Sequence, residues 1–385
     1  MKTSDKPTIP LSRPNIGAKE RDYVLRVLDS SQLALGPMLS SFEEQMAALC
    51  QVKHAIAVSS GTAALHLIVR SLNIASGDEV ITTPFSFVAS SNCLLYENAV
   101  PKFVDIEPET LSFDLDQLEA ALTPATKAIL GIDVFGEPAP WPALEQLAQK
   151  YNLSLIDDAC EAPGAFIDSR PIGSWGDAAA FGFYPNKQVT TGEGGCITTN
   201  DDTIAALCRS MSNQGRATRE RMEHVRLGYN YRMDEMSAAM GCAQVERLPG
   251  LLAARTRVAE TYEEALSPLA GDLVLPKTQS NTTRSWFVYV IQLGDQYSAE
   301  ARDVALKLLR AQGIGCATYF PSIHLQPFYR DKFGYKPGDF PMCESISNRS
   351  IALPFYPALL PQEIFRVAET LGDILPQLPK KVKTF

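Results

Sequence analysis

HAIAVSSGTAALHLIVRSLNIASGDEVITT, residues 54–83, is the stretch that decides the fold class. It begins with a short apolar run typical of a strand, continues with strong helix formers, and ends with a second strand. The same alternation of strands with helical segments of about 10–15 residues predicts βαβ units. The expected class is therefore α/β, with a mainly parallel, doubly wound sheet. Further strands are predicted at residues 101–106, 127–136, 153–159, 178–184 and 196–200.

The pattern changes after residue 200. An arginine-rich polar loop at 213–233 precedes a long helical run at 234–266, which we expect to break at Leu248-Pro249-Gly250. An alternating strand at 286–293, a helix and a strand at 314–320 then predict a smaller α+β part. We therefore predict two domains, a large domain at residues 1–250 and a small C-terminal domain at 251–385.

Composition and charge exclude several functional classes. The 385 residues carry a net charge of −9, which argues against nucleic acid as a partner. No run approaches the ~20 apolar residues of a membrane span, and the N-terminus lacks the apolar core of a signal peptide. The eight cysteines form no CxxC pair and only four histidines are present, so we expect reduced thiols and no metal site. These features predict a cytoplasmic protein without a membrane partner.

Polar residues gather where predicted strands end, which is where such sheets bind ligands. Ser60, Gly61 and Thr62 join a strand to a helix, whose unpaired N–H groups suit a phosphate. An ordinary serine N-cap explains the same residues. Asp157 and Asp158 end another strand, and because side chains alternate, only one of them faces each side. One carboxylate could pair with a cationic ring nitrogen, or both could lie in a solvated loop.

Lys187 follows the apolar segment 178–184 and precedes Gly-Glu-Gly-Gly at 192–195. A buried lysine can form a Schiff base, whereas an isolated lysine in a turn is usually exposed. The glycines do not complete a phosphate-binding GxxxxGK[ST] loop, because the lysine comes before them. A phosphate site, an aromatic residue, an acid and a lysine in this order are the parts that a pyridoxal phosphate enzyme needs.

Long motifs in the same order resemble the DegT/DnrJ/EryC1/StrS family of pyridoxal phosphate-dependent sugar aminotransferases. This resemblance implies the aspartate aminotransferase fold, fold type I, and pyridoxal 5'-phosphate as cofactor. It covers nearly the whole chain. The motifs are IPLSRPNIG, SSGTAALHL, DEVITTPFSFVASSN, PKFVDIEPETLSFD, LIDDACEAPGA, FGFYPNKQVTTGEGG, LGYNYRMDEMSAA and YFPSIHLQPFYR.

The resemblance also implies roles for single residues. Lys187 matches the catalytic lysine that forms the Schiff base, and Asp158 matches the acid that pairs with the pyridine nitrogen. The remaining cofactor-binding assignments are the phosphate cup of Gly61, Thr62 and Ala63, the ring-stacking Phe87, and Glu161, where the family often has glutamine or histidine near the ring oxygen.

Substrate and subunit contacts are implied in the same way. Asn230 matches an asparagine that reaches the cofactor phosphate of the neighbouring subunit, which implies a homodimer with shared active sites. His324 falls where family members approach the sugar, and Tyr319 in the same motif is assigned to the substrate. Many relatives have serine at the position of Gly182, where its hydroxyl helps to hold the phosphate, so the chain departs from the family there.

The expected activity is transfer of an amino group from glutamate to a keto-sugar linked to a nucleotide diphosphate. The product would serve amino-sugar biosynthesis, for a surface polysaccharide or a glycosylated metabolite. Relatives that dehydrate sugars have histidine in place of the lysine, so Lys187 favours transamination. The alternatives are an aminotransferase acting on a cyclic polyol ketone, and a non-catalytic regulatory protein of the same fold.

Overall fold

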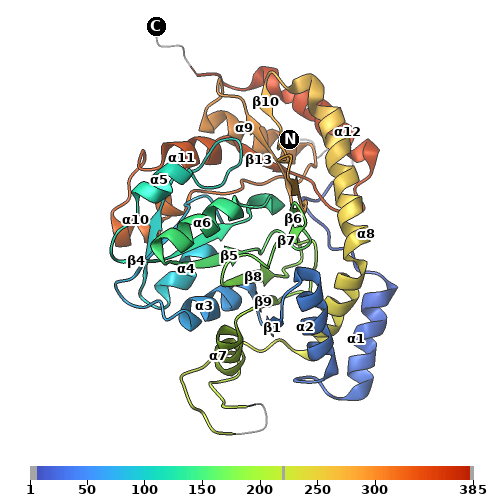
Figure 1. The fold of residues 1–385 in the computed structure, drawn as a ribbon. Helices are drawn as coiled ribbons and strands as arrows, with labels where there is room; N and C mark the ends of the chain where they lie inside the picture. The colour runs from blue at the N-terminus through green and yellow to red at the C-terminus, as the bar shows by residue number, and fades with distance from the viewer. Residues whose placement is uncertain (1–6, 219–221, 382–385) are drawn as a thin grey trace.

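The computed structural model describes residues 7–218 and 222–381 and has a seven-stranded sheet at its centre (Figure 1). The sheet is mainly parallel, as predicted, and β9 runs antiparallel to its neighbours β1 and β8. Its strands are almost wholly buried and near-continuously apolar, because helices cover both faces. In spatial order the strands are β1 (His54–Val58), β9 (Gly195–Thr199), β8 (Ala178–Gly182), β5 (Ser154–Asp158), β4 (Thr126–Ile132), β2 (Glu79–Thr82) and β3 (Val100–Phe103).

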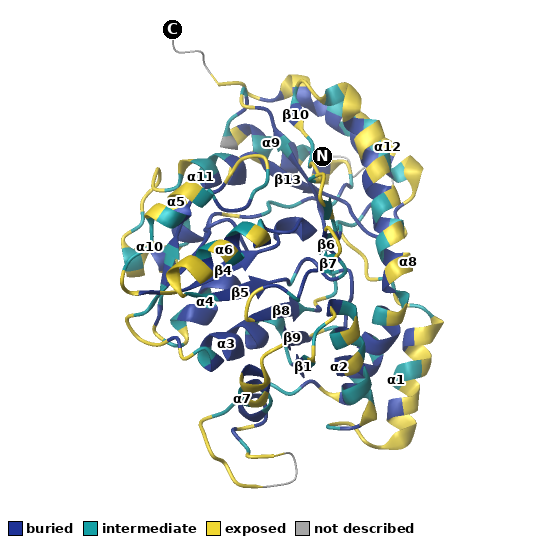
Figure 2. Cartoon of the chain, viewed as in Figure 1, coloured by how far each residue is buried: buried dark blue, intermediate teal, exposed yellow. Residues whose placement is uncertain are grey.

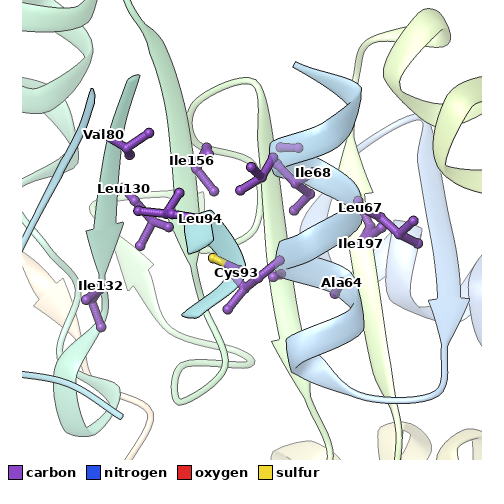
Figure 3. Close-up of a cluster of buried hydrophobic side chains, with 14 of the residues drawn as sticks. Ala64, Leu67, Ile68, Val80, Cys93, Leu94, Leu130, Ile132, Ile156 and Ile197 are labelled. Atoms are coloured by element: carbon purple, nitrogen blue, oxygen red, sulfur yellow. The ribbon is translucent and has the colours of Figure 1, made fainter. Parts of the chain in front are cut away.

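Two apolar clusters, one on each face of the sheet, hold the helices in place. On one face, Ala64, Leu67 and Ile68 pack against Ile156 and Ile197 of the strands (Figure 3). That face is covered by α3 (Gly61–Ser71), α4 (Ala89–Leu95) and α7 (Asp202–Ser212). The other face is covered by α2 (Pro37–Cys50), α5 (Leu115–Ala120), α6 (Trp141–Tyr151) and the first part of α8 (Glu235–Leu266).

A third apolar cluster lies in the C-terminal part of the chain. It forms around a three-stranded antiparallel sheet and the second half of α8. The elements of this part are β10 (Leu273–Val274), β12 (Tyr289–Leu293), β13 (Ser350–Leu353), α9 (Ala299–Ala311), α10 (Pro327–Phe333), α11 (Pro341–Ser347) and α12 (Pro361–Ile374). A small third sheet joins the two parts through β6 (Phe166–Ile167), β7 (Arg170–Pro171) and β11 (Thr282–Thr283).

Helix α8 runs along one side of both parts without a break (Figure 1). The predicted interruption at Leu248-Pro249-Gly250 is therefore wrong. Leu248 and Leu251 are buried on the inner side, while Pro249 and Gly250 are exposed, so the proline ring stands in solvent and packing maintains the helix. Because α8 spans residue 250, the division into 1–250 and 251–385 stays a prediction.

Other differences concern short or amphipathic segments. The predicted strand at 314–320 is wrong, since it contributes only isolated bridges at Ile314 and Ala317. Helix α1 (Ala18–Ser30) was not expected, and its outer face is exposed, including Leu25 and Leu28 (Figure 2).

All eight cysteines lie in the described part and are free thiols. Within residues 7–218 and 222–381, no helix combines the length and apolar character needed to cross a membrane.

Candidate active site

A cavity of about 440 Å³ lies where several strands of the large sheet end. Its volume is within the range of small-molecule sites, and this sheet edge is the expected place for a ligand. The cavity collects residues from β5, β8, the starts of α3 and α4, and the C-terminal part of the chain. Of the predicted site residues it brings together Gly61, Thr62, Phe87, Asp158, Glu161, Lys187 and Tyr319.

The start of helix α3 forms one wall of the cavity. Ser60 is its N-cap, because its hydroxyl accepts a hydrogen bond from the N–H of Ala63 at 3.1 Å. Gly61 and Thr62 line the cavity at the positive end of the helix. A Cβ at Gly61 would lie 2.9 Å from Cys160 Sγ, so a side chain has no room there. The capping role is therefore confirmed and leaves the cavity end of the helix open to an anion, and Ala63 serves the cap rather than the cavity wall.

Asp157 and Asp158 face opposite sides of β5. Asp158 lines the cavity, where its Oδ2 accepts a hydrogen bond from Ser90 Oγ at 2.6 Å. Its Oδ1 accepts one from the N–H of Cys160 at 3.3 Å. Asp157 is fully buried on the far side of the sheet, where Oδ2 accepts from the N–H of Gly173 at 3.1 Å. Neither residue lies in a solvated loop, and only Asp158 is placed to meet a ligand.

The buried Asp157 lies beside Asp133, which follows β4, and each carboxyl group has one buried oxygen, Oδ1 of Asp157 and Oδ2 of Asp133, without a hydrogen-bond partner among the described residues. Asp133 Oδ1 also accepts from the N–H of Ala139 and from Nε1 of Trp141, both at 2.8 Å. Burial raises the pKa of Asp133 to about 7. Burial and then the charge of Asp133 raise the pKa of Asp157 well above its usual range. Two carboxyl groups can hydrogen-bond to each other only if one is protonated, so a proton held by Asp157 would satisfy both of these oxygens.

Lys187 points into the cavity from the turn that follows β8. Its Nζ donates a hydrogen bond to Glu161 Oε1 at 3.2 Å and lies 3.8 Å from the ring centroid of Phe287. The side chain is only 14% exposed, which excludes the alternative of a solvated surface lysine. The largely covered amine therefore lies at the cavity wall between a carboxylate and an aromatic face.

Glu161 and Tyr319 complete this side of the cavity. Glu161 Oε2 accepts a hydrogen bond from the N–H of Phe135 at 2.8 Å, which fixes the carboxylate. Burial raises the pKa of Glu161, and Lys187 opposes that shift. The hydroxyl of Tyr319 accepts a hydrogen bond from Asn186 Nδ2 at 3.3 Å. Tyr319 therefore lies at the cavity wall beside the lysine turn, and its assignment to the substrate stays a prediction.

Three predicted site residues lie outside this cavity: Ala63, which serves the helix cap, His324 and Asn230. His324 is fully buried, its Nε2 lies 3.0 Å from Glu344 Oε1, and its ring packs against Phe340. Burial lowers the pKa of His324. The assignment of His324 to the substrate finds no support in this arrangement. Asn230 is exposed in the loop after α7, where it pairs with Asn213, so it does not reach the cavity of its own chain.

Three cavity residues were not anticipated from the sequence as functional. Ser90 orients Asp158, and its place at the start of α4, just after Phe87, could have indicated it. Phe287 comes from the C-terminal part, and no local pattern points to it. Cys160 lines the cavity beside Gly182, and burial raises its pKa well above the usual thiol value, so the thiol stays protonated. Gly182 also lines the cavity, without a hydroxyl.

Known proteins resemble this chain along nearly its whole length. The chain is 38% identical to GDP-perosamine synthase of Caulobacter vibrioides over 97% of this chain and all of that protein. The structure of S. venezuelae DesV in complex with a ketimine intermediate has a TM-score of 0.89 and 31% identity, over 97% and 100% of the two chains. DesI in the presence of its TDP-sugar product has a TM-score of 0.86 and 30% identity, over 96% and 93%. The model of the DegT/DnrJ/EryC1/StrS aminotransferase family matches residues 14–372, and the chain therefore belongs to this family.

Proposed function

We propose that the chain is a pyridoxal phosphate-dependent aminotransferase that moves an amino group from glutamate to a keto-sugar linked to a nucleotide diphosphate. The observation that carries the proposal is the presence of Lys187, Asp158 and the start of α3 in one cavity. The relatives named GDP-perosamine synthase and DesI, the latter with its TDP-sugar product, support the substrate class.

The residues present fit pyridoxal 5'-phosphate. The N-terminus of α3 suits its phosphate, and Asp158, already oriented by Ser90, suits the ring nitrogen. Phe87, whose side chain is 62% exposed at the cavity, offers a face for stacking on the ring. Lys187 is the amine for its aldehyde. When bound, the cofactor supplies a ring that accepts electrons from the substrate carbon.

Lys187 and Glu161 would carry out the proton transfer. The Nζ of Lys187 would take the proton from the α-carbon of the amino donor as a general base and, in the second half-reaction, deliver a proton to the acceptor sugar carbon as a general acid. Glu161 Oε1 lies 3.2 Å from that Nζ and holds it whenever the lysine is free. The buried position of both side chains keeps water away from the proton transfer.

Room for a substrate larger than a single sugar is available beside the cavity. A groove of about 820 Å³ shares Ser86, Phe87 and Phe320 with the cavity and is lined mainly by apolar and aromatic side chains. Lys332 is on its wall and could meet a phosphate. These features favour a nucleotide-linked sugar over a cyclic polyol ketone, which needs no such groove.

A homodimer with shared active sites is part of the same proposal. Asn230 is exposed in a loop that projects below α7 (Figure 1), which suits contact with a second subunit. The loop also exposes Met222, at 71%, and Leu227, at 67%. Residues 219–221 of this loop lie outside the described part of the chain. The glutamate donor and the cytoplasmic location stay predictions.

The proposal is tested by absorbance and by turnover. Purified protein with pyridoxal phosphate should be yellow, and glutamate should bleach that colour. Lys187→Ala should abolish the colour change and the transfer, whereas Lys307→Ala, at an exposed position on α9, should not. A panel of keto-sugars with and without a nucleotide diphosphate, together with a cyclic polyol ketone, would identify the acceptor. Normal turnover by Lys187→Ala, or protein that ignores the cofactor, contradicts the assignment.

A further inference from the structure

Arg255 of α8 is a buried cation that forms no ion pair with any described residue. Its side chain is 3% exposed, and no carboxylate of residues 7–218 and 222–381 lies within ion-pair distance of it. Burial alone lowers its pKa, to about 10, so the guanidinium is still charged at neutral pH. Arg284, also buried, differs because Glu137 lies 3.9 Å from its Nε. Burying a charge without a counterion costs free energy, so the other contacts of Arg255 must stabilise its buried guanidinium.

The contacts of Arg255 are backbone carbonyls on two walls of the cavity. Nη1 donates to the carbonyl of Phe287 at 3.0 Å. Nη2 donates to the carbonyl of Lys187 at 3.1 Å and to that of Asn186 at 3.4 Å. The guanidinium carbon lies 5.6 Å from the ring centroid of Phe355, and Nε has no partner. The guanidinium therefore joins the lysine turn after β8 to the segment that enters β12.

Both segments carry side chains that meet in the cavity. The Nζ of Lys187 lies 3.8 Å from the ring centroid of Phe287, so the two residues bonded to Arg255 also contact each other. The planar fork of an arginine can hold two carbonyls at a set separation, which the ammonium of a lysine cannot do. Holding both backbones fixes the distance between the amine and the aromatic face.

We propose that Arg255 is a positioning residue for Lys187. It binds the carbonyls of Lys187 and Phe287 together, and so sets where the lysine amine stands over the Phe287 ring. This inference rests on the proposed function, because it gives the position of the amine a catalytic purpose. Arg255 touches neither substrate nor cofactor and acts only through Lys187.

The experiment uses Arg255→Met and Arg255→Lys, with Arg257→Met as the matched control, since Arg257 is exposed on the same helix. Cofactor-free protein is incubated with pyridoxal, which lacks the phosphate, then reduced with borohydride, and the label at Lys187 is quantified by peptide mapping. The melting temperature of each variant is measured, and labelling is done well below it. Steady-state kinetics of the loaded enzyme separate kcat from KM.

Arg255→Met should lower the labelling of Lys187 and kcat by about 10- to 100-fold, because a displacement of about 1 Å at a reacting group can cost that much. KM for the amino donor should change little. Arg255→Lys, which keeps the charge without the fork, should recover less than a tenth of the lost labelling, and Arg257→Met should match the natural chain.

Three results would overturn the inference: variants that lose only thermal stability while labelling stays within twofold, full recovery by Arg255→Lys, or an equal effect of Arg257→Met. If Arg255→Met does not fold, Arg255→Lys alone still tests the inference, because lysine lacks the planar guanidinium that binds both carbonyls. Failure of the proposed function is distinguishable, because the natural chain itself would then show no selective label at Lys187.

Discussion

Replacing Asp157 with asparagine should remove a pH-dependent loss of stability. Asp157 keeps its proton in the folded state, because burial and Asp133 raise its pKa. In the unfolded chain an aspartate loses its proton near pH 3.9. Below that pH the two states bind the proton equally, and the contribution of Asp157 to stability is fully present. As the pH rises towards the raised folded pKa, the unfolded chain releases a proton that the folded chain keeps, and stability falls.

The expected magnitude follows from the slope of about 1.4 kcal/mol per pH unit for one proton. From about pH 4 upwards, the natural chain should therefore lose stability relative to Asp157→Asn, by at most about this amount for each pH unit. The asparagine is neutral at every pH and keeps both contacts. Its Nδ2 can donate to Asp133 in place of the carboxyl proton, and its oxygen can accept from the N–H of Gly173. The variant should thus be the more stable protein at pH 7.

The assay is urea unfolding of the cofactor-free protein at a fixed protein concentration, followed by tryptophan fluorescence from pH 4 to pH 8. Asp29→Asn, at an exposed position on α1, is the control and should run parallel to the natural chain. The reasoning is refuted if the difference between Asp157→Asn and the natural chain is the same at every pH. It is also refuted if the variant is less stable at pH 7, which would mean that Asp157 is ionised in the folded protein.

Substitutions at four further positions test the site and its support. Gly136→Ala should destabilise the protein by about 3 kcal/mol or more, since the new Cβ would overlap the carbonyl oxygen of Ser285 and φ is +83°. Gly250→Ala, on the open side of α8, should instead stabilise the protein by about 1 kcal/mol, which is measured as a higher melting temperature. Glu235→Ala should cost about 3 kcal/mol in urea unfolding, because its carboxylate accepts three N–H groups at the start of α2, and Glu235→Gln should recover part of this loss. Gly182→Ser should tighten pyridoxal phosphate binding about fivefold in a fluorescence titration, because the serine adds one hydroxyl. Stability should change little, since the serine Cβ fits 3.4 Å from Cys160 Sγ. Unchanged affinity would contradict a phosphate at that position.

Local patterns were sufficient for the large sheet and for the site residues that follow its strands. Each βαβ unit carries its own signal, and the ends of parallel strands meet at one edge, so Gly61, Phe87, Asp158 and Lys187 could be placed together in advance. The choice between the two aspartates was different. Alternation shows that they diverge, but their burial on opposite faces depends on the packing of the whole sheet.

Tertiary contacts explain what the patterns missed. Pro249 normally ends a helix, yet burial of Leu248 and Leu251 maintains α8 through it. Phe287 and Arg255 reach the lysine from about a hundred and about seventy residues further along the chain, where no motif marks them. His324 was assigned by its place in a motif, and only the packing of the C-terminal part shows it turned towards Glu344.

The residues on the two faces of β5 bear on how the chain sets the register of this strand in the sheet. Leu155 and Ile156 are as similar as the two aspartates after them, so a strand shifted by one residue would present nearly the same chemistry to each face. Asp177 removes this ambiguity. Its N–H donates to the carbonyl of Leu155, and its Oδ2 accepts from the N–H of Leu155, both at 2.8 Å. A residue that touches no ligand thus selects which of two adjacent aspartates becomes the acid of the cavity.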